Sequence, residues 1–307
     1  MEGVVGYSVF GLSYTELRHR LYEGRPLMVG SDIEASLRSL GHQLDAPGAL
    51  GALVHHMPRR VQEHHRLELN HRVDIISTLT AETTPRALSE AAMEHRSARL
   101  TGDAIELALD AATEQSKPAA VAGLLGSDLM GALQRARREE ETRQHAERLV
   151  AAGAELIIVK SSASLLELLF GIQAVTRLNL PCWAVVNDEL ADELDVKSLA
   201  QRCYEMGVEA LLFETASVDS GVRLLRAVEH YDGPLVKGAL LNAAEGCLRG
   251  FPEPLADQWV DRALALTESG ARIIGGGAGT TSAHTCALAA SLGDLHPTLS
   301  PPPVCPF

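Results

Sequence analysis

Short apolar segments recur along the chain, each followed by a polar or glycine-containing turn and then by a stretch with helical periodicity. Eight of these apolar segments are present, at residues 26–30, 73–78, 119–126, 155–161, 182–187, 209–215, 234–240 and 271–276. Runs such as Leu156-Ile157-Ile158-Val159 lack the alternation of a half-exposed strand and are typical of parallel strands covered on both faces. We therefore predict an α/β protein built on a parallel sheet.

The stretches between these segments predict the helices that connect the strands. Helical patterns occupy residues 91–112, 129–152, 165–177, 196–206, 218–231 and 255–269, and another follows at 282–292. Strands are expected to begin just after Gly153, Gly207 and Gly270. A glycine past a helix end readily adopts the left-handed conformation that ends the helix, so these positions mark helix-to-strand boundaries.

Eight strand–helix units in a chain of this length predict a single closed (β/α)8 TIM barrel rather than an open sheet. A doubly wound dinucleotide fold would need Gly-x-Gly-x-x-Gly after its first strand, whereas residues 30–34 read Gly-Ser-Asp-Ile-Glu. We expect an N-terminal helical segment at 1–24, the barrel at 25–293 and a proline-rich tail at 294–307. The long connection 41–58 is expected to form an extra hairpin or cap.

Composition narrows the classes of partner. The chain has 307 residues and a net charge of −13. It lacks the excess of Lys and Arg that would neutralise phosphate groups, so nucleic acid is not an expected partner. Its five cysteines are odd in number and widely spaced, which argues against a disulfide framework and a zinc ribbon. No apolar run reaches the ~18 residues of a membrane span, and no basic segment opens the chain. We expect a cytoplasmic protein with no membrane partner.

Two lysines are the strongest candidates for chemistry, because reactive residues of such barrels lie at the C-terminal ends of the strands. Lys160 and Lys237 fall on predicted strands and are both expected at this mouth of the barrel. Glu214 is the expected counter-ion, since a lysine inside a barrel must be paired or have its pKa lowered. These three residues predict one of two functions: a lysine that binds an anionic substrate, or a lysine that reacts covalently or transfers a proton. The alternative is a buried ion pair that only fills space.

Other polar or small residues follow the remaining strands. In chain order they are Ser31, Asp32, Ser77, Thr78, Ser127, Asp128, Ser161, Ser162, Asn187, Asp188, Thr215 and the glycine-rich segment 274–281. The glycines let a ligand approach the backbone, and the helix that follows presents its N-terminus to an anion such as carboxylate or phosphate. A tight structural turn is the commoner role of such a segment.

Residues 272–284, Arg-Ile-Ile-Gly-Gly-Gly-Ala-Gly-Thr-Thr-Ser-Ala-His, resemble the closing motif of the homocysteine S-methyltransferase family, Ile-Gly-Gly-Cys-Cys-Gly-Thr-Thr-Pro-x-His. Further matches in the family's order are Leu37, Gly41, Pro58, Val61, His65, Asp74-Ile75-Ile76, Val121-Ala122-Gly123 and Leu125-Gly126. The resemblance implies a (β/α)8 barrel that moves a methyl group to the homocysteine thiol. Its donors would be betaine, S-methylmethionine or, through cobalamin, methyltetrahydrofolate.

Members of this family hold zinc with one cysteine after the sixth strand and with an adjacent Cys-Cys pair after the eighth. The resemblance places Thr215, Gly277 and Ala278 at these three positions. Zinc needs about three soft or borderline protein ligands to hold a thiolate, and these residue types cannot supply them. No zinc cofactor is therefore expected. The family's Glu-Thr after the fourth strand is Lys160-Ser161 here, and its Asp-Gly after the first is Gly30-Ser31.

We therefore expect a methyltransferase-like transferase that acts on a small thiol or other nucleophile without a conventional zinc site. The predicted catalytic residues are Lys160, Glu214 and Lys237, and the predicted substrate-binding residues are Ser31, Asp32, Thr78, Asn187, Thr215, Gly277, Ala278 and Thr280. The expected partner is a small-molecule substrate with a carboxylate. Two alternatives stay open: a lysine-dependent lyase or aldolase-type enzyme, and a non-catalytic barrel that binds a small molecule or a partner protein. The sequence leaves the oligomeric state open, a homo-oligomer included.

Overall fold

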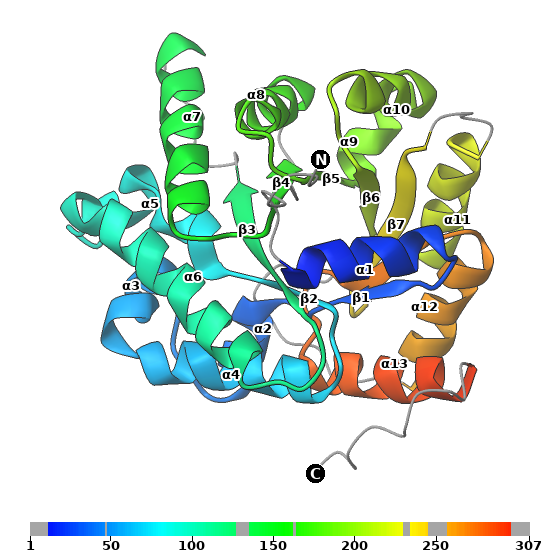
Figure 1. Ribbon diagram of the computed structural model, residues 1–307, viewed down its shortest axis with the longest axis horizontal. Coiled ribbons are helices and arrows are strands. Elements are labelled where there is room, and N and C mark those ends of the chain that lie inside the picture. The colour runs from blue at the N-terminus through cyan, green and yellow to red at the C-terminus, as the bar shows by residue number, and fades with distance from the viewer. Residues whose placement is uncertain are drawn as a thin grey trace, which may run out of the picture.

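A computed structural model of the chain describes residues 12–46, 48–126, 135–161, 164–229, 234–244 and 257–295. Eight parallel strands form one closed barrel in the order β1 to β8, with the helices around it (Figure 1). The strands are β1 Leu27–Val29, β2 Ile75–Ser77, β3 Ala120–Gly126, β4 Leu156–Ser161, β5 Cys182–Asn187, β6 Ala210–Thr215, β7 Val236–Leu241 and β8 Ile273–Gly276. The predicted single (β/α)8 barrel is confirmed, and each predicted apolar segment overlaps one strand.

Helices follow the strands as the periodicity indicates. They are α1 Leu12–Tyr22, α2 Ile33–Ser39, α3 Ala49–His56, α4 Pro58–Asn70, α5 Pro85–Ser89, α6 Ser97–Thr113, α7 Arg135–Ala151, α8 Leu165–Thr176, α9 Asp188–Asp192, α10 Val196–Glu205, α11 Val218–Ala227, α12 Asp257–Glu268 and α13 Ser282–Leu295, with 3-10 turns η1 Leu79–Thr83 and η2 Glu94–Arg96. The boundary expected at residue 293 thus falls inside α13, and most of the predicted tail lies outside the described residues.

Two expectations about local structure are corrected. The connection 41–58 forms no hairpin in its described part, because it contains α3, whose residues Leu50, Leu53 and Val54 are buried. The helix expected from residue 91 begins only at Ser97. Ala92 has a left-handed φ of 53°, which an α-helix cannot include, and the short turn η2 intervenes.

The barrel interior is packed with side chains, as in other barrels of this fold. Its lower layer comes from the first inward-facing residues of seven strands: Leu27, Ile75, Ala120, Leu156, Trp183, Ala210 and Ile273. Side chains of opposite parity, such as Ile76, Val121 and Leu211, belong instead to a larger cluster between the barrel and its helices. The two clusters explain why the strands read as continuous apolar runs.

Helix α1 covers the N-terminal end of the barrel. Tyr14, Leu17 and Leu21 pack into the interior cluster, and Tyr14 and Leu17 are almost fully buried. The Tyr14 hydroxyl donates to Glu209 Oε2 at 2.6 Å and accepts from Trp183 Nε1 at 3.0 Å. The Tyr14 and Trp183 rings meet edge to face at 6.2 Å. The apolar layer and this polar chain therefore close the end of the barrel opposite the expected mouth.

No helix in the described part of the chain is both long and apolar enough to cross a lipid bilayer.

Candidate active site

An ion pair lies inside the C-terminal mouth of the barrel. Lys160, near the end of β4, and Glu214, near the end of β6, both have the parity of inward-facing residues. Lys160 Nζ lies 2.6 Å from Glu214 Oε2, and the two side chains are 23% and 9% exposed. The pairing expected of these two residues is therefore present. Partial exposure of the lysine leaves it accessible to a ligand that enters the mouth.

Lys237, the third predicted catalytic residue, does not join this pair. It is the second residue of β7 and lies in register with Leu211, near the start of β6. This places it at the N-terminal end of the barrel. Its parity matches that of Leu211 and Ala239, which face the helices rather than the interior. The expectation of two amines at the mouth is thus corrected to one. The apolar segment 234–240 predicted a strand but not which end of it carries the lysine.

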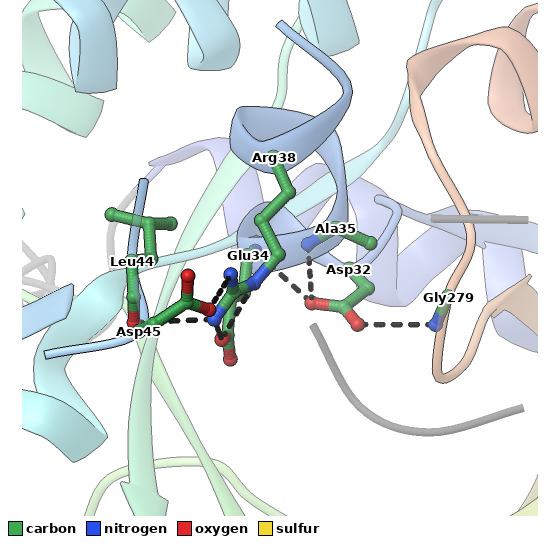
Figure 2. A network of polar contacts seen from close by, with 7 residues as sticks. All are labelled: Asp32, Glu34, Ala35, Arg38, Leu44, Asp45 and Gly279. Atoms are coloured by element: carbon green, nitrogen blue, oxygen red, sulfur yellow. Dashed lines mark hydrogen bonds and ion pairs between the residues drawn. The ribbon is translucent and has the colours of Figure 1, made fainter. Parts of the chain in front are cut away.

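Asp32 and the glycine-rich loop after β8 are tied together (Figure 2). Asp32 Oδ1 caps α2 by accepting from the backbone N–H groups of Glu34 and Ala35, and Oδ2 accepts from Gly279 N at 3.1 Å. In return, the Asp32 N–H donates to Thr280 Oγ1 at 3.1 Å. Thr280 also donates from this hydroxyl to Gly277 O at 2.7 Å. These two predicted substrate-binding residues therefore join the loops after β1 and β8.

Arg38 extends the same network away from the mouth. Its guanidinium donates to Glu34 Oε1, to Asp45 Oδ1 at 2.7 Å and to the Leu44 carbonyl oxygen (Figure 2). The described part of the segment after α2 is thereby held against that helix.

Ser31 has a partner that the sequence did not suggest. The Ser31 hydroxyl donates to Glu68 Oε1 at 2.7 Å, and the Ser31 N–H donates to Glu68 Oε2 at 3.2 Å. Burial raises the pKa of Glu68, which is 1% exposed and also accepts from Thr285 Oγ1. A usable signal was the spacing of Val61, His65 and Glu68, which puts a carboxyl group on the apolar face of α4.

Thr78 and Asn187 are engaged in local structure. The buried Thr78 hydroxyl donates to the Ala122 carbonyl oxygen at 3.2 Å and contacts Thr80 Oγ1. Asn187 Oδ1 caps α9 by accepting from Leu190 N at 3.0 Å, and its backbone lies in register with Glu214. Asn187 therefore borders the Lys160–Glu214 pair. The Thr78 hydroxyl, in contrast, is used in hydrogen bonds within the barrel wall. The candidates Ser127, Asp128 and Ser162 lie outside the described residues.

Thr215, Gly277 and Ala278, which the sequence resemblance aligns with the zinc cysteines, lie among local hydrogen bonds and close contacts. The Thr215 hydroxyl donates to the Ser217 carbonyl oxygen at 2.7 Å. The Ala278 N–H donates to Asn242 Oδ1 at 2.8 Å. A Cβ added at Gly277 would lie only 2.3 Å from the same Asn242 oxygen. Asn242, which follows β7, therefore occupies the space that a side chain at 277 would need. Sequence reasoning missed Asn242 because its contacts are made with another strand's loop.

These residues do not fit a zinc ion. Within the described residues, no group of three or more His, Cys, Asp or Glu side chains is placed to hold a metal. Cys182 and Cys203 are buried and free, and burial raises the pKa of both thiols, that of Cys203 to about 12. Cys286 is disulfide-bonded, a bond that the odd number and wide spacing of the cysteines did not predict. None of these three sulfur atoms is available as a thiolate ligand.

Restoring the sulfur ligands is expected to require a change at Asn242. The variant Thr215→Cys/Gly277→Cys/Ala278→Cys should bind zinc at least about 10-fold more weakly than the same variant with Asn242→Ala. The reason is the steric conflict at 277, which displaces the new thiol from tetrahedral geometry. Zinc titration against a chromophoric chelator measures both affinities, with thermal melting as a folding control. Equal affinities would show that Asn242 does not block the position.

Comparison with known proteins agrees with the architecture. The chain matches the homocysteine S-methyltransferase family over residues 23–292. It is similar in structure to the metallated form of the homocysteine methyltransferase MmuM from Escherichia coli, with a TM-score of 0.75 at 20% identity over 90% of this chain and 99% of that one. For the apo form of MmuM the TM-score is 0.70 at 22% identity, over 89% and 98% of the two chains. A search of curated proteins finds no match. The extent of the family match shows that the chain belongs to the homocysteine S-methyltransferase family.

Proposed function

We propose that the protein transfers a methyl group to a small nucleophile at the C-terminal mouth of its barrel, and that Lys160 and Glu214 act there without a conventional zinc site. The observation that carries the proposal is the 2.6 Å ion pair between these residues, which is partly open to solvent on the lysine side. Family membership supports methyl transfer to a thiol as the ancestral reaction. Homocysteine is the first substrate to test, because it offers a thiol and a carboxylate.

Glu214 is the proposed general base. Its carboxylate accepts the proton of the nucleophile as that atom attacks the donor's methyl carbon, whose bond to the donor breaks with the electron pair leaving on the donor. A carboxylate acts best in this role when no cation holds both of its oxygens. A substrate carboxylate that binds Lys160 would draw the ammonium group partly away from Glu214. Substrate binding would therefore prepare the base.

Lys160 is the proposed anion clamp. Its ammonium lies on the inner face of the barrel, where a low-dielectric wall strengthens its attraction for a carboxylate or a developing thiolate. Positive charge near the nucleophile also favours loss of its proton, which is the electrostatic task of zinc in the rest of the family. Lys160 Nζ is held by Glu214, whereas a Schiff-base mechanism needs this nitrogen as the attacking nucleophile, so the clamp is favoured over covalent lysine chemistry.

The proposal predicts that Lys160→Ala abolishes stabilisation by homocysteine and lowers methyl transfer at least about 100-fold. Thermal shift with homocysteine measures the first effect. Transfer of labelled methyl from S-methylmethionine, with a chelator present, measures the second. Glu214→Gln should lower the rate more than it weakens homocysteine binding, because it keeps the shape of the side chain and removes the base.

The matched control is Lys197→Ala, which removes an exposed lysine of α10 and should change neither readout. Undiminished activity in Lys160→Ala would overturn the clamp. Activity that disappears with a chelator and returns with one equivalent of zinc would overturn the metal-free site. A borohydride-trapped adduct of a keto acid on Lys160 would replace methyl transfer with covalent lysine chemistry. If neither transfer nor a homocysteine thermal shift is detected, the proposal fails.

A further inference from the structure

A cavity lies at the N-terminal end of the barrel, opposite the Lys160–Glu214 pair. It has a volume of about 920 Å³ and is lined by α1, by the segments that precede β1, β2 and β3, and by α13. This volume is in the range of pockets that hold small organic ligands. The proposed methyl transfer uses none of its residues.

The charged lining is positive in a protein that is acidic overall. Apart from histidine, the charged lining residues that the structure describes are four cationic ones, Arg20, Arg25, Arg72 and Lys117, and two acidic ones, Glu16 and Asp74, an excess of 4 − 2 = 2 positive charges among them. Arg25 is in addition ion-paired with Glu23, which is not among these lining residues. The whole chain carries −13. Basic residues therefore cluster at this cavity although the whole protein is acidic. A cluster of basic residues attracts anions.

Asp74 already has a partner. Arg20 Nη1 lies 2.6 Å from Asp74 Oδ1, and Asp74 Oδ2 accepts from the Met28 N–H at 2.8 Å. This pair orients the Arg20 guanidinium along the cavity wall without neutralising the other cations. Burial and the nearby Arg72 lower the pKa of Lys117, an effect that Asp74 partly offsets and Arg20 reinforces. The three cations line the same cavity.

Arg72 occupies a backbone position where four other helix ends use glycine. It is the second residue after α4 and has a left-handed φ of 63°. The equivalent residues after α2, α7, α10 and α12 are Gly41, Gly153, Gly207 and Gly270, all with positive φ. A non-glycine residue in this conformation is strained, and such strain often marks a functional position. At this position the strain puts a guanidinium in the cavity.

The rest of the lining is suited to the apolar part of an organic ligand. Apolar side chains form one wall: Met28, Leu69, Val73, Ala119, Ala289 and Leu292. Arg20 is paired to Asp74 and Arg25 to Glu23. Arg72 and Lys117 are therefore the cationic side chains assigned to the anionic group of a ligand. Guanidinium groups bind phosphate oxygens in a bidentate manner, which fits the arginines here. We propose that this cavity binds a small organic phosphate monoester, with Arg72 and Lys117 on the phosphate and the apolar wall against its organic part.

Phenyl phosphate is a suitable probe, because it joins a dianionic phosphate to an apolar ring. Calorimetric titration should give a dissociation constant below about 1 mM, weakening as salt rises, since the attraction is electrostatic. Phenol should not bind measurably at the same concentrations, and inorganic phosphate should bind at least about 10-fold more weakly, because it cannot use the apolar wall. Equal affinity for inorganic phosphate would reduce the site to an adventitious anion site and overturn the proposal.

Two substitutions separate binding from folding. Lys117→Gln, on an exposed loop, should weaken phenyl phosphate binding at least about 10-fold, while Lys197→Gln, an exposed lysine elsewhere, should not change it. Arg72→Gly should weaken binding similarly while leaving the melting temperature of the ligand-free protein equal or higher, because glycine relieves the left-handed strain. Unchanged affinity in both Lys117→Gln and Arg72→Gly, or no binding to the unmodified protein, would overturn the proposal.

Discussion

Lowering the pH from 7.5 to 5 is expected to remove much of the free energy of unfolding of this protein. Buried histidines are responsible, chiefly the four whose pKa is lowered most; burial also lowers the pKa of His71. Burial lowers the pKa of His64, His145 and His284 to about 4, and burial together with the neighbouring His64 lowers that of His65 to about 3. All four are at most 3% exposed.

The sign follows from where the protons bind. In the unfolded chain these histidines titrate near about 6.5, so below that pH the unfolded state takes up protons that the folded state does not. Stability is therefore complete above about pH 6.5 and falls steadily towards pH 4. At pH 5 each histidine costs about 2 kcal/mol, and the four together approach the ~5–15 kcal/mol that a whole domain has.

Two buried carboxyl groups act in the opposite direction. Burial raises the pKa of Glu68 and of Asp74, although Arg20 and hydrogen bonds partly offset the effect at Asp74. As the pH falls through these raised values, the folded state gains protons before the unfolded state does. These two groups should therefore make the loss of stability shallower in the pH range in which they take up protons.

Urea unfolding at a series of pH values tests this prediction, and His65→Leu provides the specific variant. Neither ring nitrogen of His65 has a hydrogen-bond partner within the described residues, so leucine removes a titrating group without breaking a bond. We expect the slope of unfolding free energy against pH to fall by about a quarter. The exposed His56→Gln should leave the slope unchanged. Constant stability down to pH 5 would show that the histidines are not held neutral.

Trp183→Ala is expected to cost about 3–5 kcal/mol of unfolding free energy, which corresponds to a drop in melting temperature on the order of 10 °C. Trp183 is fully buried in the lower layer of the barrel. Its removal leaves a cavity and also takes away the Nε1–H that donates to the Tyr14 hydroxyl. The damage should extend to α1, which that hydrogen bond helps to hold.

Tyr14→Phe separates the polar part of this effect. It keeps the aromatic packing and removes the hydroxyl between Trp183 Nε1 and Glu209, so we expect a cost of about 1–3 kcal/mol. Thermal and urea unfolding measure both variants. A Trp183→Ala protein as stable as Tyr14→Phe would show that packing around the indole contributes little.

The apolar segments located all eight strands because strands covered on both faces must be apolar throughout. They did not determine where a side chain lies along its strand, and for that reason Lys160 and Lys237 were both expected at the mouth. The strand before Lys160 is long enough to carry it to the top, whereas β7 begins at Val236. Asn242 was missed because its contacts join segments far apart in the chain, which no local pattern encodes. The spacing within α4 could have marked Glu68 as buried, but not Ser31 as its partner.

The way α1 closes the barrel has a consequence for synthesis on the ribosome. Tyr14 and its acceptor Glu209 are 195 residues apart. Translation proceeds at about 5–20 residues per second, so Glu209 is synthesised roughly 10–40 s after Tyr14. During that interval Leu17 and Leu21 lack their final covering, so the nascent chain is expected to be a client of chaperones that shield apolar N-terminal segments.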